Sequence, residues 1–118
     1  MYNIANMYKY GEGVEINKGE AARYYKMVAD NEIPFLSNEY AKMLYYGDGI
    51  EPNIKEAVRY FKKSADSGNF FAMFTYATML KTGISVDVNI YEAVRYYKMS
   101  ADTGHNAYHF ANMLYNGD

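Results

Sequence analysis

Residues 55–68 read KEAVRYFKKSADSG, and this stretch of fourteen residues occurs three times in the chain. The copy that begins at Tyr91 reads YEAVRYYKMSADTG and matches the middle copy at ten of fourteen positions. The copy that begins at Gly19 reads GEAARYYKMVADNE and matches it at seven. Successive copies begin 36 residues apart. A fixed period of this length is typical of repeat proteins, in which each unit packs only against its neighbours.

A second segment, here called A, recurs between the copies of the first, here called B. The A segments read IANMYKYGEGV from Ile4, YAKMLYYGDGI from Tyr40, YATMLKTGISV from Tyr76 and FANMLYNGD from Phe110. The first three lie 36 residues apart and the last follows after 34. Their apolar residues have helical spacing, and a glycine follows each of the first three at the point where a helix would end.

The B segments carry predicted helix starts. Each has an asparagine three residues before a glutamate, as in Asn53 and Glu56. We expect the asparagine side chain to accept a hydrogen bond from a first-turn amide and the glutamate to bond back to the asparagine N–H, as in a capping box. Within each B helix an Ala–aromatic–Ala row at i, i+4, i+8 predicts close packing on a neighbouring helix.

The chain is therefore predicted to be all-α, a right-handed α–α solenoid of antiparallel helix hairpins with a 36-residue period. The A helices are expected at about 2–10, 34–46, 69–82 and 105–116, and the B helices at 17–31, 53–67 and 89–103. Residues 1–118 form one domain, with repeat units at about 1–31, 32–67 and 68–103 and a half-repeat at 104–118.

Three motifs in a fixed order carry a family resemblance. They are A-x-M-L-x-x-G-x-G-[IV], then x-x-N-x-x-E-A-x-R-Y-[YF]-K, then A-D-x-G. Together they resemble the Sel-one-like repeat, a tetratricopeptide-like helical hairpin. The sequence departs from the pattern at Ser85, where the second loop glycine would stand, at Glu32, which replaces the closing glycine, and at the short fourth junction.

The resemblance implies a function and a place for it. Proteins of this family are mostly adaptors and scaffolds that hold protein partners, and the A helices line the concave side of the stack. It therefore implies a protein or peptide partner, of unknown identity, on the concave A-helix face. A second interpretation stays open, in which the chain is a structural repeat segment of a larger multidomain protein and binds no ligand of its own.

Candidate partner-binding residues lie on the A helices, one or two places from the buried Ala and Leu. They form two rows, Asn6, Lys42, Thr78 and Asn112 with Tyr10, Tyr46, Thr82 and Asn116, and a ladder of methionines, Met7, Met43, Met79 and Met113. Asparagine and lysine can bond a peptide backbone or a terminal carboxylate. Methionine suits an adaptable binding surface, but at helical spacing it also packs in cores, and both interpretations of the ladder remain open.

Composition excludes several classes of function. The formal charge is −2 with both signs interspersed, so nucleic acid is not an expected partner. No apolar run is long enough to span a bilayer, no signal peptide is present and there is no cysteine, which favours a cytoplasmic location. No cofactor is expected.

Three patterns that could carry chemistry have structural explanations. Gly-x-Gly in the loops follows a helix and encloses an acid, so it predicts a tight turn and not a phosphate site. His105 and His109 share a helix face but have no regular third ligand, so no metal site is predicted. The Glu–Arg–Lys row of each B helix indicates a solvated face. No nucleophile has a partner at fixed spacing, and we expect no enzymatic activity.

Both termini of the sequence interrupt a repeat. Met1 falls inside an A helix, and the last predicted A helix has no B partner. Repeat stacks normally end in polar capping units. The sequence thus leaves two alternatives, a segment of a longer array or a stack whose uncapped terminal helices make end-to-end contact with another chain.

Overall fold

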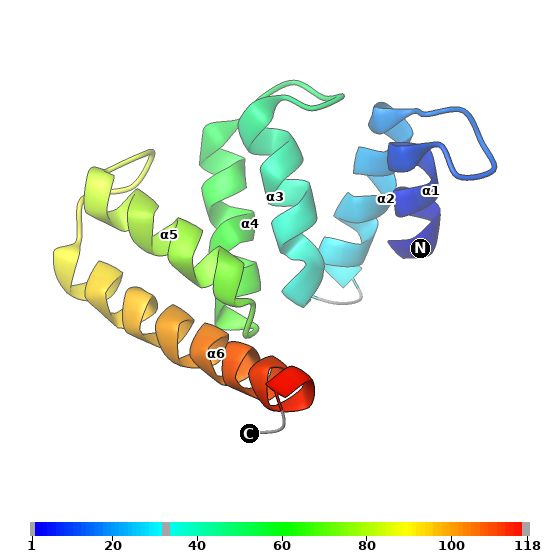
Figure 1. Ribbon diagram of the computed structural model, residues 1–118. Helices are drawn as coiled ribbons and strands as arrows, with labels where there is room; N and C mark the ends of the chain where they lie inside the picture. The colour runs from blue at the N-terminus through cyan, green and yellow to red at the C-terminus, as the bar shows by residue number, and fades with distance from the viewer. Residues whose placement is uncertain (1, 32–33, 117–118) are drawn as a thin grey trace.

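The computed structural model describes residues 2–31 and 34–116, with side chains described as far as residue 104, and within these ranges it is all-helical. The helices are α1 Tyr2–Tyr10, α2 Lys18–Asn31, a 3-10 turn at Pro34–Leu36, α3 Ser37–Tyr46, α4 Ile54–Asp66, α5 Phe70–Thr82 and α6 Ile90–Asn116. Consecutive helices form antiparallel pairs, α1 with α2, α3 with α4 and α5 with α6, and the pairs stack side by side (Figure 1). No helix within the described residues is both long and apolar enough to cross a membrane.

The core lies between the two helices of each pair and between neighbouring pairs. The predicted Ala–aromatic–Ala row is buried in α2 and in α4, where Ala57, Phe61 and Ala65 are at most 3% exposed. In α6 the row is only partly covered, since Ala93 is buried but Ala101 is exposed.

The asparagine caps are confirmed, but the capping box is wrong in its second half. Asn53 Oδ1 accepts a hydrogen bond from the backbone N–H of Glu56 at 3.1 Å, and the equivalent bonds are present at the starts of α2 and α6. The Glu56 carboxylate does not bond back, because it pairs with Arg59 at 2.9 Å. The N–H of Asn53 instead donates to the carbonyl of Leu44, near the end of α3. Each cap therefore also fastens the loop to the preceding helix.

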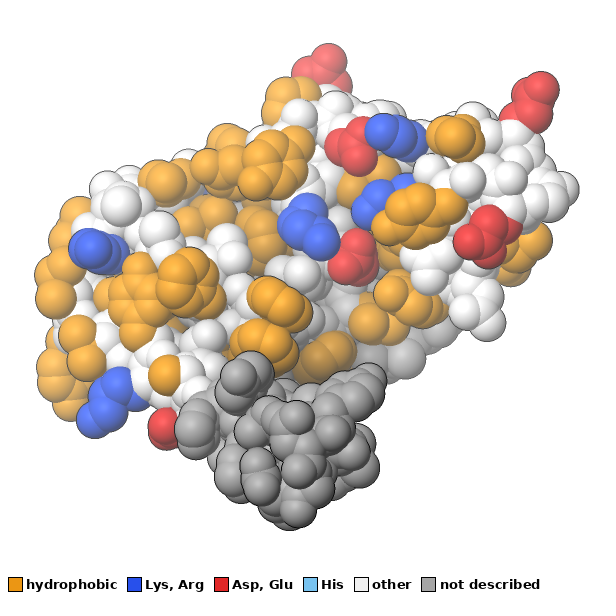
Figure 2. Space-filling model, in the orientation of Figure 1, with side chains coloured by type: hydrophobic (Ala, Val, Ile, Leu, Met, Phe, Trp, Pro, Cys, Tyr) orange, Lys and Arg blue, Asp and Glu red, His pale blue; other side chains and the backbone are white. Residues whose placement is uncertain are grey.

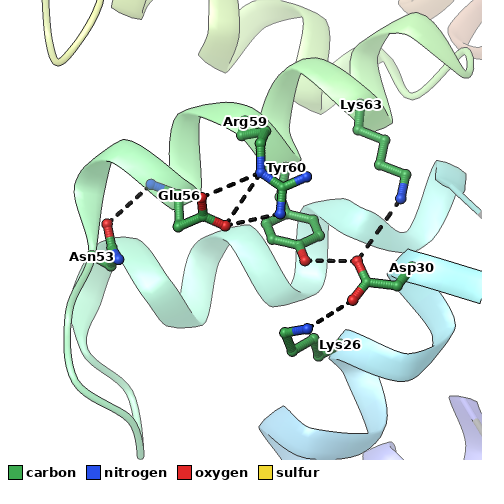
Figure 3. Close-up of polar contacts among 7 residues, drawn as sticks. All are labelled: Lys26, Asp30, Asn53, Glu56, Arg59, Tyr60 and Lys63. Atoms are coloured by element: carbon green, nitrogen blue, oxygen red, sulfur yellow. Dashed lines mark hydrogen bonds and ion pairs between the residues drawn. The ribbon is translucent and has the colours of Figure 1, made fainter.

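A buried tyrosine links each pair to the one before it. Tyr60 is 1% exposed, packs edge-on against Tyr40 of its own pair, and donates its hydroxyl to Asp30 of α2 at 2.6 Å (Figure 3). Lys26 holds the other carboxylate oxygen of Asp30 at 2.8 Å. The same arrangement recurs 36 residues later, where Tyr96 donates to Asp66. Here this contact is called the Tyr–Asp link.

The electrostatics of the link favour a neutral tyrosine and an ionised aspartate. Burial, followed by the bond to Asp30, raises the pKa of Tyr60 to about 12. Burial opposes ionisation of Asp30, but the hydrogen bonds from Lys26 and Tyr60 outweigh it and lower the pKa of that carboxyl. The link is thus a charge-assisted hydrogen bond over the whole neutral range of pH.

The last repeat differs from the prediction, because α6 runs through Gly104 as one helix of 27 residues. The predicted separate helices at 89–103 and 105–116 do not form. In the preceding repeat the chain turns at Gly68, and Asn69 caps α5 by accepting bonds from the N–H groups of Phe71 and Ala72. The position equivalent to Asn69 is His105, which is a poor N-cap, so the helix continues and extends beyond the start of α5 (Figure 1).

Candidate functional site

A hollow of about 610 Å³ lies on the face formed by α1, α3 and α5, and we call it the A-face groove. Tyr2 borders it from α1. Most of its lining comes from two helices: Asn38, Glu39, Lys42, Tyr45 and Tyr46 of α3, and Phe71, Phe74, Thr75, Thr78 and Met79 of α5. Figure 2 shows hydrophobic side chains gathered over α3 and α5, with basic and acidic side chains between them over α3.

The groove is rich in aromatic side chains that solvent reaches. Tyr46 is 75% exposed, Phe71 65% and Phe74 58%. The phenyl rings of Phe71 and Phe70 stack with centroids 4.2 Å apart, and Phe74 packs edge-on against Tyr97. Both phenylalanines of α5 therefore contact a neighbouring ring and still leave more than half of their surface exposed. Contiguous exposed apolar groups of this kind mark interaction sites.

Two charged side chains, Glu39 and Lys42, border one side of the groove, and Lys9 of α1 lies next to them. Glu39 lies between Lys42 at 3.4 Å and Lys9 of α1 at 3.5 Å. One carboxylate thus faces two ammonium groups, which leaves a local surplus of one positive charge. A smaller hollow, bordered by Lys9, Lys42, Tyr46 and Asp48, continues past this cluster. Asp48 is paired with Lys18 at 2.9 Å and does not neutralise the surplus.

The structure separates the first predicted row into two kinds of residue. Tyr25 of α2 donates its hydroxyl to Asn6, and the Tyr97 hydroxyl is 2.7 Å from that of Thr78. In the middle repeat the equivalent B-helix residue is Phe61, which has no hydroxyl, and Lys42 points instead to Glu39. Asn6 and Thr78 therefore stabilise their own helix pairs, whereas Lys42 borders the groove and pairs with Glu39 of its own helix.

The methionine ladder belongs to the core where its side chains are described in α3 and α5. Met43 is 1% exposed and Met79 is 3% exposed. Of the two interpretations that the sequence left open, packing in the core therefore describes these two residues, although Met79 also borders the groove. Met7, at 37%, is exposed in α1 but lies outside the groove lining.

The remaining predicted residues divide as follows. Tyr46 borders the groove, while Tyr10 is 60% exposed and lies outside it. Asn112, Met113 and Asn116 belong to the part of α6 whose side chains are outside the described residues, as do His105 and His109. Among the described residues no group of three or more His, Cys, Asp or Glu side chains could hold a metal ion.

Sequence reasoning missed the exposed phenylalanines of the groove, Phe71 and Phe74. Phe74 and Asn38 occupy the same position of neighbouring repeats, four residues before Thr78 and Lys42. A helical residue shares its face with the residue four before it. Extending the predicted row backward by one turn would have reached them. Phe71 could have been found from the repeat alignment, since Phe35 lies 36 residues before it and also borders the groove.

The paired, stacked helices and the groove along one helix of each pair define a tetratricopeptide-like helical repeat protein. The Sel1 repeat matches residues 1–32, 37–69 and 71–105. The chain therefore belongs to the Sel1 repeat family, whose fold is generally that of a protein-interaction scaffold and is not typically catalytic.

Two solved structures are similar over nearly the whole chain. A Sel1 repeat protein from Oxalobacter formigenes is 27% identical with a TM-score of 0.84, over 90% of this chain and 44% of that one. A protective antigen of uropathogenic Escherichia coli strains, which displays an SLR fold, is 27% identical with a TM-score of 0.82, over 99% of this chain and 26% of that one. The chain spans less than half the length of either. No curated protein sequence matches it significantly.

Proposed function

We propose that this chain is an interaction scaffold that binds a protein or peptide in the A-face groove, with no catalysis of its own. The observation that carries the proposal is the set of exposed aromatic side chains, Tyr46, Phe71 and Phe74, around one hollow of about 610 Å³. Covering a phenylalanine side chain fully is worth about 1.5–3 kcal/mol. Burial of Phe71 and Phe74 by a partner would therefore supply a large share of the affinity of a micromolar complex.

Site-specific photo-crosslinking tests the proposal in the native source. A photoreactive phenylalanine replaces Phe74 in the groove, and, as a matched control, Tyr91, which is 82% exposed and outside the groove. We expect the Phe74 probe to crosslink a partner that the Tyr91 probe does not. Phe71→Ser combined with Phe74→Ser should then lower the affinity of that purified partner by at least about tenfold while leaving the helical circular dichroism unchanged.

The second candidate is a structural segment that spaces other domains and binds nothing in the groove. This chain covers less than half of each similar structure, which favours this second candidate. It predicts equal crosslinking from the Phe74 and Tyr91 probes and no loss of any association in the double serine variant. That pattern would overturn the scaffold proposal.

A further inference from the structure

One face of α6 lacks the cover that the equivalent face of α4 has. Val94 is 50% exposed, while Val58, its equivalent in α4, is 5% exposed. Ala101 is exposed, while its equivalent Ala65 is fully buried. The helix α4 packs between α3 and α5, whereas α6 packs on α5 and forms one edge of the stack (Figure 1). The uncovered face of α6 is therefore the one that a following A helix would occupy.

The same chain contains an A-type helix that cannot reach this face. Residues 105–116 have the sequence of an A segment, but α6 runs through Gly104 without a turn, and a straight helix does not fold back on itself. A hollow of about 560 Å³ is left open at Ala101 and Gly104. At the equivalent place of the preceding pair the next A helix begins, where Asn69 donates to the carbonyl of Phe35 at 3.2 Å.

The sequence of residues 105–116 is that of an A helix that packs on a preceding B helix. Both such helices in the structure carry a buried aromatic residue and, four positions later, a buried leucine, namely Tyr40 and Leu44 in α3 and Tyr76 and Leu80 in α5. Residues 105–116 keep this pair as Phe110 and Leu114. In α1, which begins the described stack, the same positions hold Ile4 and Tyr8.

We propose that two copies of this chain form a symmetric dimer, in which their α6 helices pack antiparallel and residues 105–116 of each cover the open face of the other. Gly104 lies near the middle of α6, so a two-fold axis there places residues 105–116 of one copy opposite residues 90–102 of its partner. Ile90, Val94 and Ala101, at i, i+4 and i+11, have the spacing of an apolar seam between two helices. Exchange of an identical element is a low-cost route to a dimer, since each copy gains a contact that its own straight helix denies it.

A second arrangement competes for the same face. End-to-end stacking of copies would cover α6 with α1 of another chain, and it gives an open series because the two contacting surfaces differ. The symmetric pair closes at two copies. Neither contact needs a ligand in the A-face groove, so this inference goes beyond the proposed function and is tested separately from it.

Light scattering with gel filtration measures the mass of the wild-type chain, of His105→Asn and of His109→Asn. At micromolar concentration we expect the wild type to have twice the monomer mass of 13.6 kDa. His105→Asn recreates after Gly104 the asparagine cap that follows Gly68, so that residues 105–116 start a new helix and fold onto their own chain. This should weaken dimerisation at least about tenfold. His109→Asn, the matched control one turn later, provides no cap and should leave the dimer intact.

A charge on the open face gives a second test that leaves the buried residues unchanged. Val94→Glu should abolish the dimer, because the seam would enclose a carboxylate without a partner. Val14→Glu, at a 38% exposed position in the first loop, is the control and should leave the mass unchanged. Helical circular dichroism checks that both variants fold.

Single pyrene labels distinguish the symmetric pair from end-to-end stacking, since the chain has no cysteine of its own. A label on Asp102→Cys lies near the two-fold axis and should give excimer fluorescence, which dilution removes. Labels on Tyr91→Cys would lie about 35 Å apart along the helix pair and should give none.

Three results would each overturn this inference. They are a wild-type chain of monomer mass at micromolar concentration, a dimer that Val94→Glu or His105→Asn leaves unchanged, and a mass that grows past two copies without excimer from residue 102. The last result would assign the face of α6 to end-to-end stacking. All three leave the crosslinking test of the A-face groove unaffected.

Discussion

Tyr60 couples two repeats through a single hydroxyl group. Its ring fills the space beside Tyr40, with centroids 4.8 Å apart and planes at 86°, and its oxygen reaches the Asp30 carboxylate of the preceding pair. Apolar packing and a charge-assisted hydrogen bond are thus combined in one side chain. Removing only the oxygen separates the two contributions.

Tyr60→Phe should lower the free energy of unfolding by about 1 kcal/mol, because the ring stays buried while one hydrogen bond to Asp30 is lost. Urea unfolding followed by circular dichroism measures the change. Tyr96→Phe, at the equivalent position, should give a similar loss. Tyr91→Phe is the control, since that side chain is 82% exposed and its removal should change stability by less than about 0.5 kcal/mol.

Ser85 occupies the backbone conformation that its repeat equivalents fill with glycine. Its φ is 54°, while Gly13 and Gly49 have φ of 78° and 85°. The sequence predicted a local departure at this loop, and the structure shows that the loop retains the left-handed turn with a residue that disfavours it. The replacement therefore stores strain in the third loop.

Ser85→Gly should raise the free energy of unfolding by up to about 1 kcal/mol, since left-handed backbone costs an L-residue about 1–2 kcal/mol and glycine's greater freedom offsets part of the gain. Denaturant unfolding again provides the measurement. The reverse change, Gly49→Ala, should destabilise strongly, because its Cβ would come within 2.9 Å of the Lys18 backbone carbonyl carbon. Equal stability of all three proteins would contradict the argument.

At the scale of helices, the two Tyr–Asp links make the free energy of unfolding depend on pH. The pKa values of Asp30 and Asp66 are lowered in the folded chain, because hydrogen bonds from a lysine and a tyrosine outweigh burial. A group whose pKa is lower when folded stabilises the protein above its unfolded pKa, near 3.9, and this contribution is lost as the pH falls through the folded value.

Between about pH 6 and pH 3, the wild-type chain should therefore lose more stability than a variant carrying Asp30→Asn and Asp66→Asn. The difference between the two urea midpoints, measured across that range, isolates the links from the other carboxylates. We expect the variant to be less stable at neutral pH, with the gap closing in acid. A gap that stays constant with pH would count against the links.

The first five helices could be predicted from the repeats almost completely, whereas the length of the last helix could not. Among the described residues, five of the six α-helices begin and end within a few residues of the predicted bounds, because each has a periodic apolar face and a marked end. The Glu56 side chain was misassigned since Arg59, three residues on, competes for its carboxylate. At Gly104 the repeat pattern predicted a turn, but that pattern alone did not show that a cap at the next residue was needed.

Across the whole molecule, the stack is open rather than compact. The Cα radius of gyration is 15.8 Å, against about 13.5 Å for a compact chain of this length. The family resemblance predicted binding on the A-helix face, and the groove lies on the face of α1, α3 and α5. Its aromatic character was only partly predictable from the repeats, because Phe71 recurs at Phe35, whereas the position of Phe74 holds Asn38 in the preceding repeat. The repeated residues specify the frame, and the variable ones specify the surface.

End-to-end contact between chains stays a prediction, and the repeat register now identifies the residues it would use. Tyr24 and Asp102 occupy the positions of Tyr60 and Asp66 in the first and third repeats. We expect light scattering with gel filtration to give a mass above 13.6 kDa at high concentration, reduced by Tyr24→Phe together with Asp102→Asn. A single species of monomer mass at every concentration would contradict this contact.

The bond from each capping asparagine N–H to the preceding helix has a mechanical consequence. It clamps the loop inside each helix pair, and the most extensive contacts of the molecule lie within pairs, between α5 and α6 and between α3 and α4. We expect relative motion of the three helix pairs to occur first at the α2–α3 and α4–α5 boundaries. Pulling on the two ends of the stack should separate the helix pairs and widen the groove before any helix loses a backbone hydrogen bond.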